Sequence, residues 1–358
     1  MSTRAIDIEA IDTLAASPLT RAEWNRLVAA SESNTVFQTH EWLASWCAVS
    51  ATHRPLLLLG RIDGVPIGIA PLARAGRTLR FAADHHADYC DVIVAPAHKD
   101  RFLRAVLQYL ADRRADWDAL SLLNIPDRSS TLTLLRRHAR RLGLHVLVRG
   151  TVPCPTILLG AYPDPRRALL RKDSLQRPYR FFARSGALQF RDIATLDEAR
   201  ALLPRFFAQH EARWRDTATP SLFHDADNRR FYEILLEEMW PSGWLVFSVL
   251  TYNDAPIAFH LGFDYDNCFL WYKPSFDVQL RRHSPGNVML HQLLARGLDT
   301  GKAEFDFSVG DEAFKRRYCN ATRYNRNLVV THRTHAVAAA RVTLGVKRIL
   351  RPLWKAGS

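Results

Sequence analysis

The residues best suited to chemistry lie in one segment, residues 281–287, and an apolar run that is expected to be helical follows them. Pro285 fixes one backbone angle and Gly286 permits unusual ones, so the chain should turn where this helix begins. The first N–H groups of a helix have no partner within it and carry partial positive charge, which favours phosphate binding. The predicted phosphate-binding residues are Arg281, Arg282, Ser284, Gly286 and Asn287.

Two flanking segments indicate how this turn is positioned. Residues 268–273 and 303–308 are rich in apolar side chains and are expected to be strands. The turn and its helix would then connect two neighbouring strands. A Ser-Pro-Gly sequence on its own more often marks only the start of a helix. The flanking strands favour the phosphate-binding interpretation.

Three further side chains are candidates for catalysis beside such a phosphate. Asp306 ends the second strand and is predicted to be a general base or an anchor for an acceptor. Lys315 is expected to meet negative charge on an acceptor or on a developing oxyanion. His260 shares a strand segment with Ala258 and Gly262, and this small-residue face would leave room for an acyl chain or an acceptor.

Each of these residues also has a structural interpretation, which the sequence leaves open. Asp306 could brace a loop, and Lys315 could belong to a solvated basic face, as could Arg281 and Arg282. A helix could pack on the small residues around His260. Metal ligands are not expected, because the histidine pairs lack a third ligand at useful spacing. The five cysteines are scattered and should be buried thiols rather than disulfides.

The expected elements occur twice in the same order, which predicts a duplicated α/β domain. Two helices, at residues 22–30 and 41–49, precede a hairpin at residues 56–70 with an Asp-Gly turn. Two helices at residues 196–214 and 228–240 precede a second hairpin, and a strand, a helix and a strand follow each hairpin. A cluster of prolines predicts a domain boundary. The predicted domains are residues 1–160 and 161–335, with a basic amphipathic helix at 336–358.

The formal net charge of +13 predicts an anionic partner. CoA, a nucleotide-sugar, a lipid phosphate, a membrane surface or RNA would each fit, and a basic surface also serves solubility. No segment is apolar enough to span a membrane and no signal peptide is evident, so a cytoplasmic protein is expected. The helix at residues 336–358 would contact the inner face of the membrane or complete its own domain.

Several motifs resemble one family of enzymes. Residues 306–315, Asp-Phe-Ser-Val-Gly-Asp-Glu-Ala-Phe-Lys, look like the C-terminal domain of GNAT-type acyltransferases of the CelD-like group, as does the preceding Ser-Pro-Gly. That group is associated with cellulose and other exopolysaccharide synthesis, and it resembles the FemABX peptidyltransferases. Residues 37–46, 68–72 and 88–91 are similar to the group's N-terminal motifs. The resemblance covers roughly residues 20–330.

The resemblance implies an α/β fold of tandem GNAT-like domains with mixed central sheets, the double-GNAT architecture of FemABX proteins, with the first domain degenerate. It implies an N-acyltransferase that moves an acyl group from acetyl-CoA or a longer acyl-CoA to an amino group. The acceptor would be a small or lipid-linked molecule, such as a sugar or lipid-linked intermediate of surface polysaccharide synthesis. Lys315 would be the lysine of the family's terminal motif.

Two alternatives remain open at this point. One is a FemX-like transferase that takes its acyl group from aminoacyl-tRNA. Only under this alternative is a nucleic acid expected as a partner in catalysis. The other is a GNAT scaffold that binds a nucleotide or RNA without catalysis. The sequence also departs from the family, because Pro178 interrupts the basic helix expected at residues 171–180.

Overall fold

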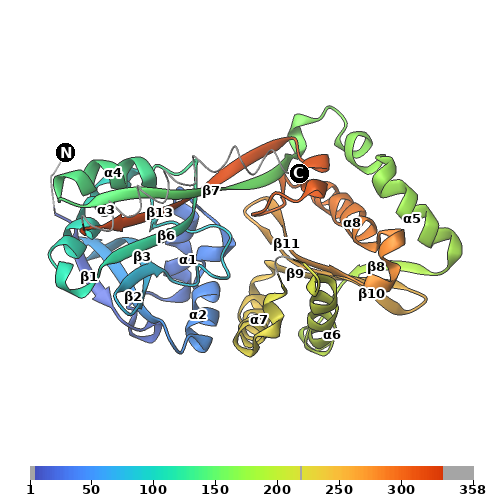
Figure 1. Cartoon of the computed structure of the whole chain (residues 1–358), viewed down its shortest axis with the longest axis horizontal. Coiled ribbons are helices and arrows are strands. Elements are labelled where there is room, and N and C mark those ends of the chain that lie inside the picture. The colour runs from blue at the N-terminus through green and yellow to red at the C-terminus, as the bar shows by residue number, and fades with distance from the viewer. Residues whose placement is uncertain (1–4, 218–219, 334–358) are drawn as a thin grey trace. The chain divides into compact units, whose positions relative to one another are not determined.

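The computed structural model describes residues 5–217 and 220–333, and the helix predicted at residues 336–358 lies outside them. The chain forms two compact units (Figure 1). Within the described residues, unit 1 comprises 5–33, 52–151 and 325–333, and unit 2 comprises 34–51, 152–217 and 220–324. These units are not the contiguous domains that the sequence predicts. One N-terminal helix belongs to unit 2, and one C-terminal strand returns to unit 1.

Unit 1 is built on a mixed sheet with the strand order β1-β2-β3-β4-β6-β13-β7, and β5 pairs with β3. Strands β1 to β4 pair antiparallel, whereas β4 and β6 run parallel. The strands are β1 (Asp7–Ile11), β2 (Arg54–Ile62), β3 (Val65–Ala75), β4 (Thr78–Phe81), β5 (Ile93–Val94), β6 (Ala119–Pro126), β7 (His145–Leu158) and β13 (Ala321–Thr331). The helices are α1 (Arg21–Ala30), α3 (Pro96–Ala111) and α4 (Thr131–Arg141).

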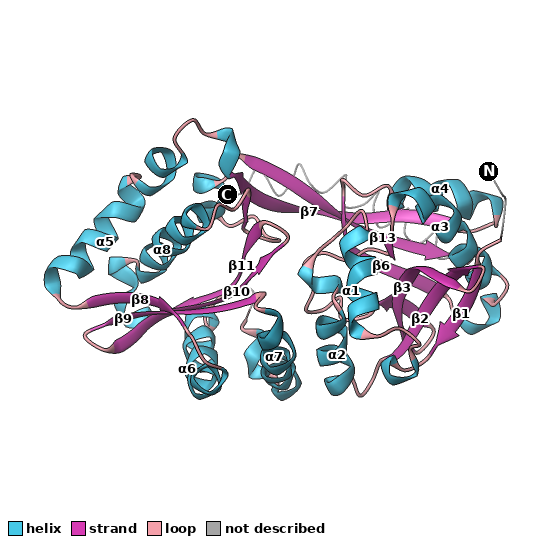
Figure 2. Cartoon of the chain, turned by 180° about the vertical axis from the view of Figure 1, so that it is seen from behind, coloured by secondary structure: helices cyan, strands magenta, loops and turns pink. Residues whose placement is uncertain are grey.

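Unit 2 repeats this arrangement with the strand order β7-β12-β11-β10-β9-β8, in which only β11 and β12 pair in parallel. Figures 1 and 2 show α5 and α8 on one face of this sheet and α6 and α7 on the other. The strands are β8 (Leu188–Asp192), β9 (Leu245–Tyr252), β10 (Ala255–Tyr265), β11 (Cys268–Phe276) and β12 (Glu304–Asp306). The helices are α2 (His40–Val49), α5 (Asp173–Ser185), α6 (Leu196–Trp214), α7 (Ala226–Met239), α8 (Pro285–Asp299) and α9 (Ala313–Tyr318).

Two-residue turns join the antiparallel strands of both units. The central residues, all with positive φ, are Asp63–Gly64, Asn253–Asp254 and Asp266–Asn267. A turn of this kind matches the twist of the strands it connects, and Asn, Asp and Gly adopt its backbone angles at least cost. The hairpin predicted around the Asp-Gly turn is confirmed as β2 and β3. Among the described residues, no helix is long and apolar enough to cross a membrane.

Helix α2 belongs to unit 2 because of the side chains that it buries there. Trp42 is fully buried, and its ring lies 4.7 Å from Phe37, 5.4 Å from Phe231 of α7 and 5.7 Å from Phe263 of β10, measured between centroids. Edge-to-face pairs of this kind stabilise a core beyond the burial of apolar area. The packing of this aromatic cluster therefore places α2 in unit 2, although the residues on both sides of it in the sequence belong to unit 1.

A buried ion network connects the helices of unit 1. Lys99 of α3 donates from Nζ to Glu32 at 2.6 Å, to Asp91 at 2.9 Å and to Ser129 at 2.9 Å. Asp91 is fully buried and also accepts a hydrogen bond from the Thr131 hydroxyl at the start of α4. Buried charges are tolerated when they are paired and hydrogen-bonded in this way.

Candidate functional site

The candidate site is centred where β11 and β12 separate. The two strands pair in parallel only from Cys268–Glu304 to Leu270–Asp306. Strand β12 ends at Asp306, whereas β11 continues to Phe276. The register of β11 against β10 also shifts after Leu270, the mark of a β-bulge. Such a bulge redirects backbone N–H groups, and the N–H of Tyr272 donates to Nε2 of His260 at 3.4 Å. The edge of β11 that β12 leaves after Leu270 is where a ligand could meet the strand backbone.

The predicted helix start follows directly, which confirms the strand-turn-helix order. Ser284 has a left-handed conformation with φ of 55°, and α8 begins at Pro285 without a hydrogen bond from a capping side chain. Gly286 lies against the end of β11, because a Cβ atom at this position would be 3.2 Å from the ring of Phe276. A glycine here keeps the strand end and the helix start close together. The ring of Phe276 therefore packs against the space that a side chain at position 286 would fill.

Asn287 has a structural role that the sequence analysis did not anticipate. Pro178 lies within α5 and cannot donate a hydrogen bond to the carbonyl of Ser174, four residues earlier. The side chain of Asn287 donates to that carbonyl at 3.1 Å. Helix α5 therefore continues through its proline, and Asn287 braces α5 rather than facing a ligand.

The basic residues before α8 are exposed. Arg281, Arg282 and His283 end a short 3-10 helix, and neither arginine forms an ion pair with an acidic residue of the described chain. The imidazole of His283 stacks on Phe181 of α5 at 3.9 Å between centroids, with only 3° between the ring planes. Both guanidinium groups therefore remain available to a phosphate beside the start of α8.

His260 lies in the core of unit 2 and not on an open face, which corrects that expectation. Its exposed fraction is 0%, and its ring packs against Phe269 and Trp271. A Cβ atom at Gly262 would lie 2.2 Å from His260 Cε1, so the imidazole occupies the space that the small residue leaves. Burial lowers the pKa of His260 to about 3, with a smaller contribution from Arg296. A neutral, enclosed imidazole cannot exchange protons with a substrate.

Asp306 and Lys315 both brace the loop at residues 307–312. Asp306 accepts a hydrogen bond from the backbone N–H of Ser308 at 2.7 Å. Lys315 is buried, donates from Nζ to the carbonyl of Val309 at 2.7 Å, and pairs with Glu312 at 2.9 Å. The structure thus brings the two predicted residues to one loop at the end of β12. Asp306 has the bracing role that the sequence left open, whereas Lys315 is buried and does not belong to a solvated basic face.

We expect Lys315→Met to loosen this loop. The carbonyl of Val309 would lose its charged donor, which costs about 1–3 kcal/mol of unfolding free energy. Hydrogen–deuterium exchange of residues 307–312 should rise, while exchange in β9 and β10 stays unchanged. Arg317→Met is the matched control, since Arg317 is an exposed residue of the same helix. Equal protection of the loop in both variants would refute the bracing role.

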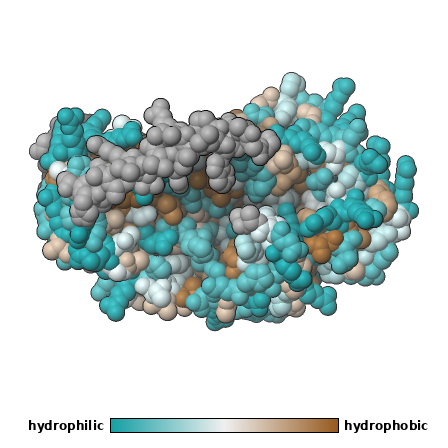
Figure 3. All heavy atoms as spheres, in the orientation of Figure 1, coloured by the Kyte–Doolittle hydropathy of each residue, from teal (hydrophilic) through white to brown (hydrophobic). Residues whose placement is uncertain are grey.

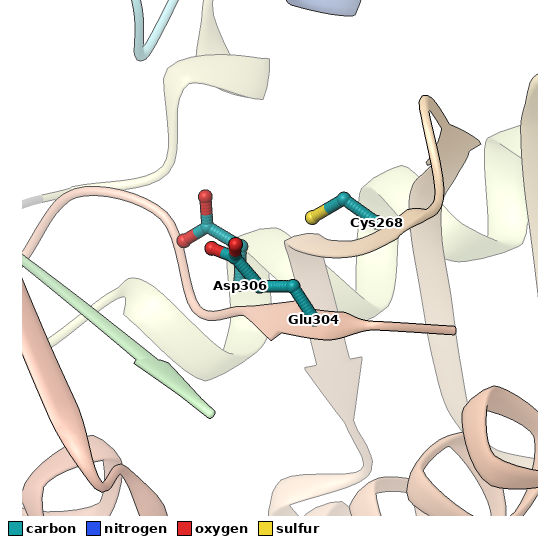
Figure 4. Close-up of side chains that lie close together, drawn as sticks. All are labelled: Cys268, Glu304 and Asp306. Atoms are coloured by element: carbon teal, nitrogen blue, oxygen red, sulfur yellow. The ribbon is translucent and has the colours of Figure 1, made fainter. Parts of the chain in front are cut away.

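Cys268, Glu304 and Asp306 form the one group with metal-ligand chemistry that the described residues contain, and their donor atoms lie within 4.8 Å of one another (Figure 4). Glu304 is already paired with Arg323 and accepts a hydrogen bond from Thr156. Burial raises the pKa of the Cys268 thiol well above its usual value, and the charges of Asp306 and Glu304 add to that shift. A protonated thiol beside a neutralised carboxylate is a poor ligand set.

Sequence reasoning missed Arg213, which α6 places against the part of β11 beyond its pairing with β12. Its guanidinium donates to the carbonyl of Pro274 at 2.6 Å and lies 4.6 Å from the ring centre of Phe276. Burial lowers the pKa of Arg213 to about 10, the charge of Glu312 opposes this shift, and Arg281 adds to it. Arg213, Arg281 and Glu312 therefore lie within electrostatic reach of one another. No local motif marks Arg213, because the arrangement depends on how α6 packs on the sheet.

Unit 1 has the corresponding pair of parallel strands, but its own chain fills the separation. Strands β4 and β6 pair from Thr78–Ala119 to Arg80–Ser121. Beyond these pairs, Cys90 donates its N–H to the carbonyl of Asn124 at 3.0 Å, and the Asn124 side chain donates to the carbonyl of Ala87 at 2.9 Å. The loop before α3 thus occupies the edge of β6. We therefore assign the candidate site to unit 2.

Comparison with known proteins agrees with this assignment. Residues 170–316 match the family model described as an acetyltransferase (GNAT) domain. The matched segment includes β11, α8, β12 and most of α9, so it contains the whole of the candidate site. A search of curated proteins found no match to the chain.

Solved structures have a similar fold over most of the chain. The chain is similar to FemX, with 11% identity and a TM-score of 0.58 over 88% of this chain and 96% of that one. A tandem GNAT protein from the clavulanic acid biosynthesis pathway matches with 12% identity and a TM-score of 0.51, over 90% and 98%. The C-terminal domain of a putative lysylphosphatidylglycerol synthetase from Agrobacterium fabrum matches with 14% identity and a TM-score of 0.54, over 92% and 97%. The predicted FemX-like, tandem-GNAT fold is confirmed.

Proposed function

We propose that unit 2 transfers an acyl group from acyl-CoA to an amino group. The observation that carries the proposal is the separation of β11 from β12 beside the uncapped start of α8, within a GNAT domain. A helix start offers N–H groups and positive potential to a diphosphate. Gly286 adds no side chain of its own at this helix start, and the exposed Arg281 and Arg282 lie beside it, so the residues present fit the nucleotide end of CoA.

In this proposal each part of the donor has its own partner. Arg281 and Arg282 flank the diphosphate at Gly286. The acyl thioester lies along β11 beyond Leu270, where a backbone N–H on the edge that β12 leaves stabilises the developing oxyanion. Direct attack by the amine forms the C–N bond while the C–S bond breaks and the thiolate of CoA leaves. Burial keeps the Cys268 thiol protonated, which argues against a covalent acyl-enzyme at that residue.

Glu312 is the carboxylate that we propose for the acceptor side. Its side chain is 43% exposed at the end of the braced loop, and it pairs with Lys315. A carboxylate there could position the attacking amine and take up its proton. Asp306 and Lys315 would then act as positioning residues. The motifs at residues 306–315 support, as the acceptor, an amino group on a sugar or lipid-linked intermediate of surface polysaccharide synthesis. We place this reaction in the cytoplasm.

Calorimetry with acetyl-CoA tests the proposal. We expect the protein to bind acetyl-CoA, and Gly286→Val to weaken binding by about tenfold or more, because the branched side chain obstructs the backbone and displaces Phe276. Gly160→Val is the control, since a Cβ atom at Gly160 meets no atom within 4 Å. Unchanged affinity in Gly286→Val would refute the assigned donor site. Thermal stabilisation by aminoacyl-tRNA but not by acetyl-CoA would instead favour the FemX-like alternative.

A further inference from the structure

Helix α5 presents a basic stripe on its exposed face. Arg177, Arg180, Phe181 and Arg184 are all exposed, and their spacing of three, four and seven residues places them on one side of the helix. The single acidic residue of α5 is Asp173, in its first turn. Figure 3 shows hydrophilic side chains projecting over this part of unit 2. Like charges at such spacings destabilise a helix, and a bound anion would reduce the repulsion between these arginines.

The stripe joins the candidate site through one aromatic pair. Phe181 is 42% exposed, and its ring stacks on the imidazole of His283, the residue directly before Ser284. We define the cationic patch as this pair together with five arginines of α5 and of the segment before α8. These arginines are Arg177, Arg180, Arg184, Arg281 and Arg282. None forms an ion pair with a carboxylate of the described chain, whereas Arg191, Arg200 and Arg296 of the same unit do.

We propose that the cationic patch binds the 3′-phosphoadenosine end of CoA, an inference that rests on the proposed function. The base stacks against the Phe181–His283 pair, and the arginines of α5 hold the 3′-phosphate. Because His283 is adjacent to the start of α8, a ligand whose diphosphate lies at Gly286 must pass beside this pair. Guanidinium groups bind phosphate through charge-assisted, bidentate hydrogen bonds.

The size of the patch favours one nucleotide over a polymer or a membrane. Residues 177–184 span about 10 Å of helix, and the patch offers one aromatic pair. A protein that binds single-stranded nucleic acid commonly stacks several successive bases along a basic groove. A helix that lies on a membrane buries a broad apolar face, but Phe181 is the one apolar side chain among the four exposed residues of the stripe.

Comparison of CoA with 3′-dephospho-CoA tests the patch. In the triple variant Arg177→Gln, Arg180→Gln, Arg184→Gln, we expect affinity for CoA to fall by about tenfold or more, because charge-assisted hydrogen bonds are lost. Affinity for dephospho-CoA should change little. The control variant Arg167→Gln, Arg171→Gln, Arg205→Gln removes three exposed arginines of the same unit and should keep the preference for CoA.

A second variant tests the stacking. Phe181→Ala should weaken both ligands equally, by about fivefold or more, since the base is common to them. If the triple variant keeps the wild-type preference for CoA while Gly286→Val still weakens binding as expected, the patch proposal is wrong and the proposed function stands. Loss of tRNA or of phosphatidylglycerol vesicle binding in the triple variant, with the CoA preference intact, would also overturn it. Failure of the wild-type protein to bind CoA would overturn both.

Discussion

Lys99→Met should destabilise unit 1 by about 3–5 kcal/mol, because it leaves a buried carboxylate without its counter-ion. Lys99 is 1% exposed, and Asp91 beside it is 0% exposed. Asp91 would keep its bonds from Ser129 and Thr131, but these hydroxyl groups carry no charge. Hydrogen–deuterium exchange, followed separately in peptides of the two units, should show the loss in α3 and α4 and not in unit 2.

Two further variants separate charge from packing in this network. Arg104→Met changes an exposed residue of the same helix and should alter stability by no more than about 0.5 kcal/mol. The double variant Lys99→Met, Asp91→Asn removes both charges and should recover part of the loss, since no uncompensated ion remains buried. A double variant that recovers none of the loss seen in Lys99→Met would show that the uncompensated charge of Asp91 is not its cause.

Trp42→Ala should destabilise unit 2 by about 3–5 kcal/mol, the usual cost of deleting a large buried aromatic side chain. The indole is fully enclosed, and it contacts Phe37, Phe231 and Phe263. Removal would leave a cavity between α2 and the sheet of unit 2. Urea unfolding, with exchange measured in α7 and β10, would report the loss.

Trp42→Phe is the matched control for this prediction. The indole Nε1 is buried and has no hydrogen-bond partner among the described residues, so a phenyl ring keeps much of the packing and removes an unsatisfied donor. We expect this variant to lose far less stability than Trp42→Ala. Faster exchange confined to unit 1 in Trp42→Ala would contradict the assignment of α2 to unit 2.

Local signals in the sequence were sufficient for most elements of the fold. The Asp63–Gly64 turn and its flanking strands predicted a hairpin, and the structure contains it. The turn at Ser284 and the helix after Pro285 were also predicted, because Pro and Gly restrict the backbone locally. By contrast, the domain boundaries depend on which aromatic side chains Trp42 meets, and no local pattern contains that information.

The same distinction between local and long-range information applies to the candidate site. The position of Gly286, Arg281 and Arg282 at the start of one helix was predictable because Pro and Gly restrict the backbone locally, and phosphate binding there stays a prediction. His260 was misplaced, since alternation within a strand shows which side chains share a face but not that the ring turns over Gly262. The partner of Asn287 depends on Pro178, more than a hundred residues earlier, which only the packing of α5 reveals.

The position of β13 late in the chain determines when unit 1 can finish folding during synthesis. Residues 325–331 of β13 pair with β6, whose own residues are made some two hundred positions earlier. At about 5–20 residues per second, the ribosome needs about 10 to 35 s to make residues 152–324, and β6 lacks this neighbour throughout. An unpaired strand edge is a template for aggregation. Unit 1, although first from the ribosome, therefore depends on the last described strand, and truncation before residue 325 should leave it prone to aggregate.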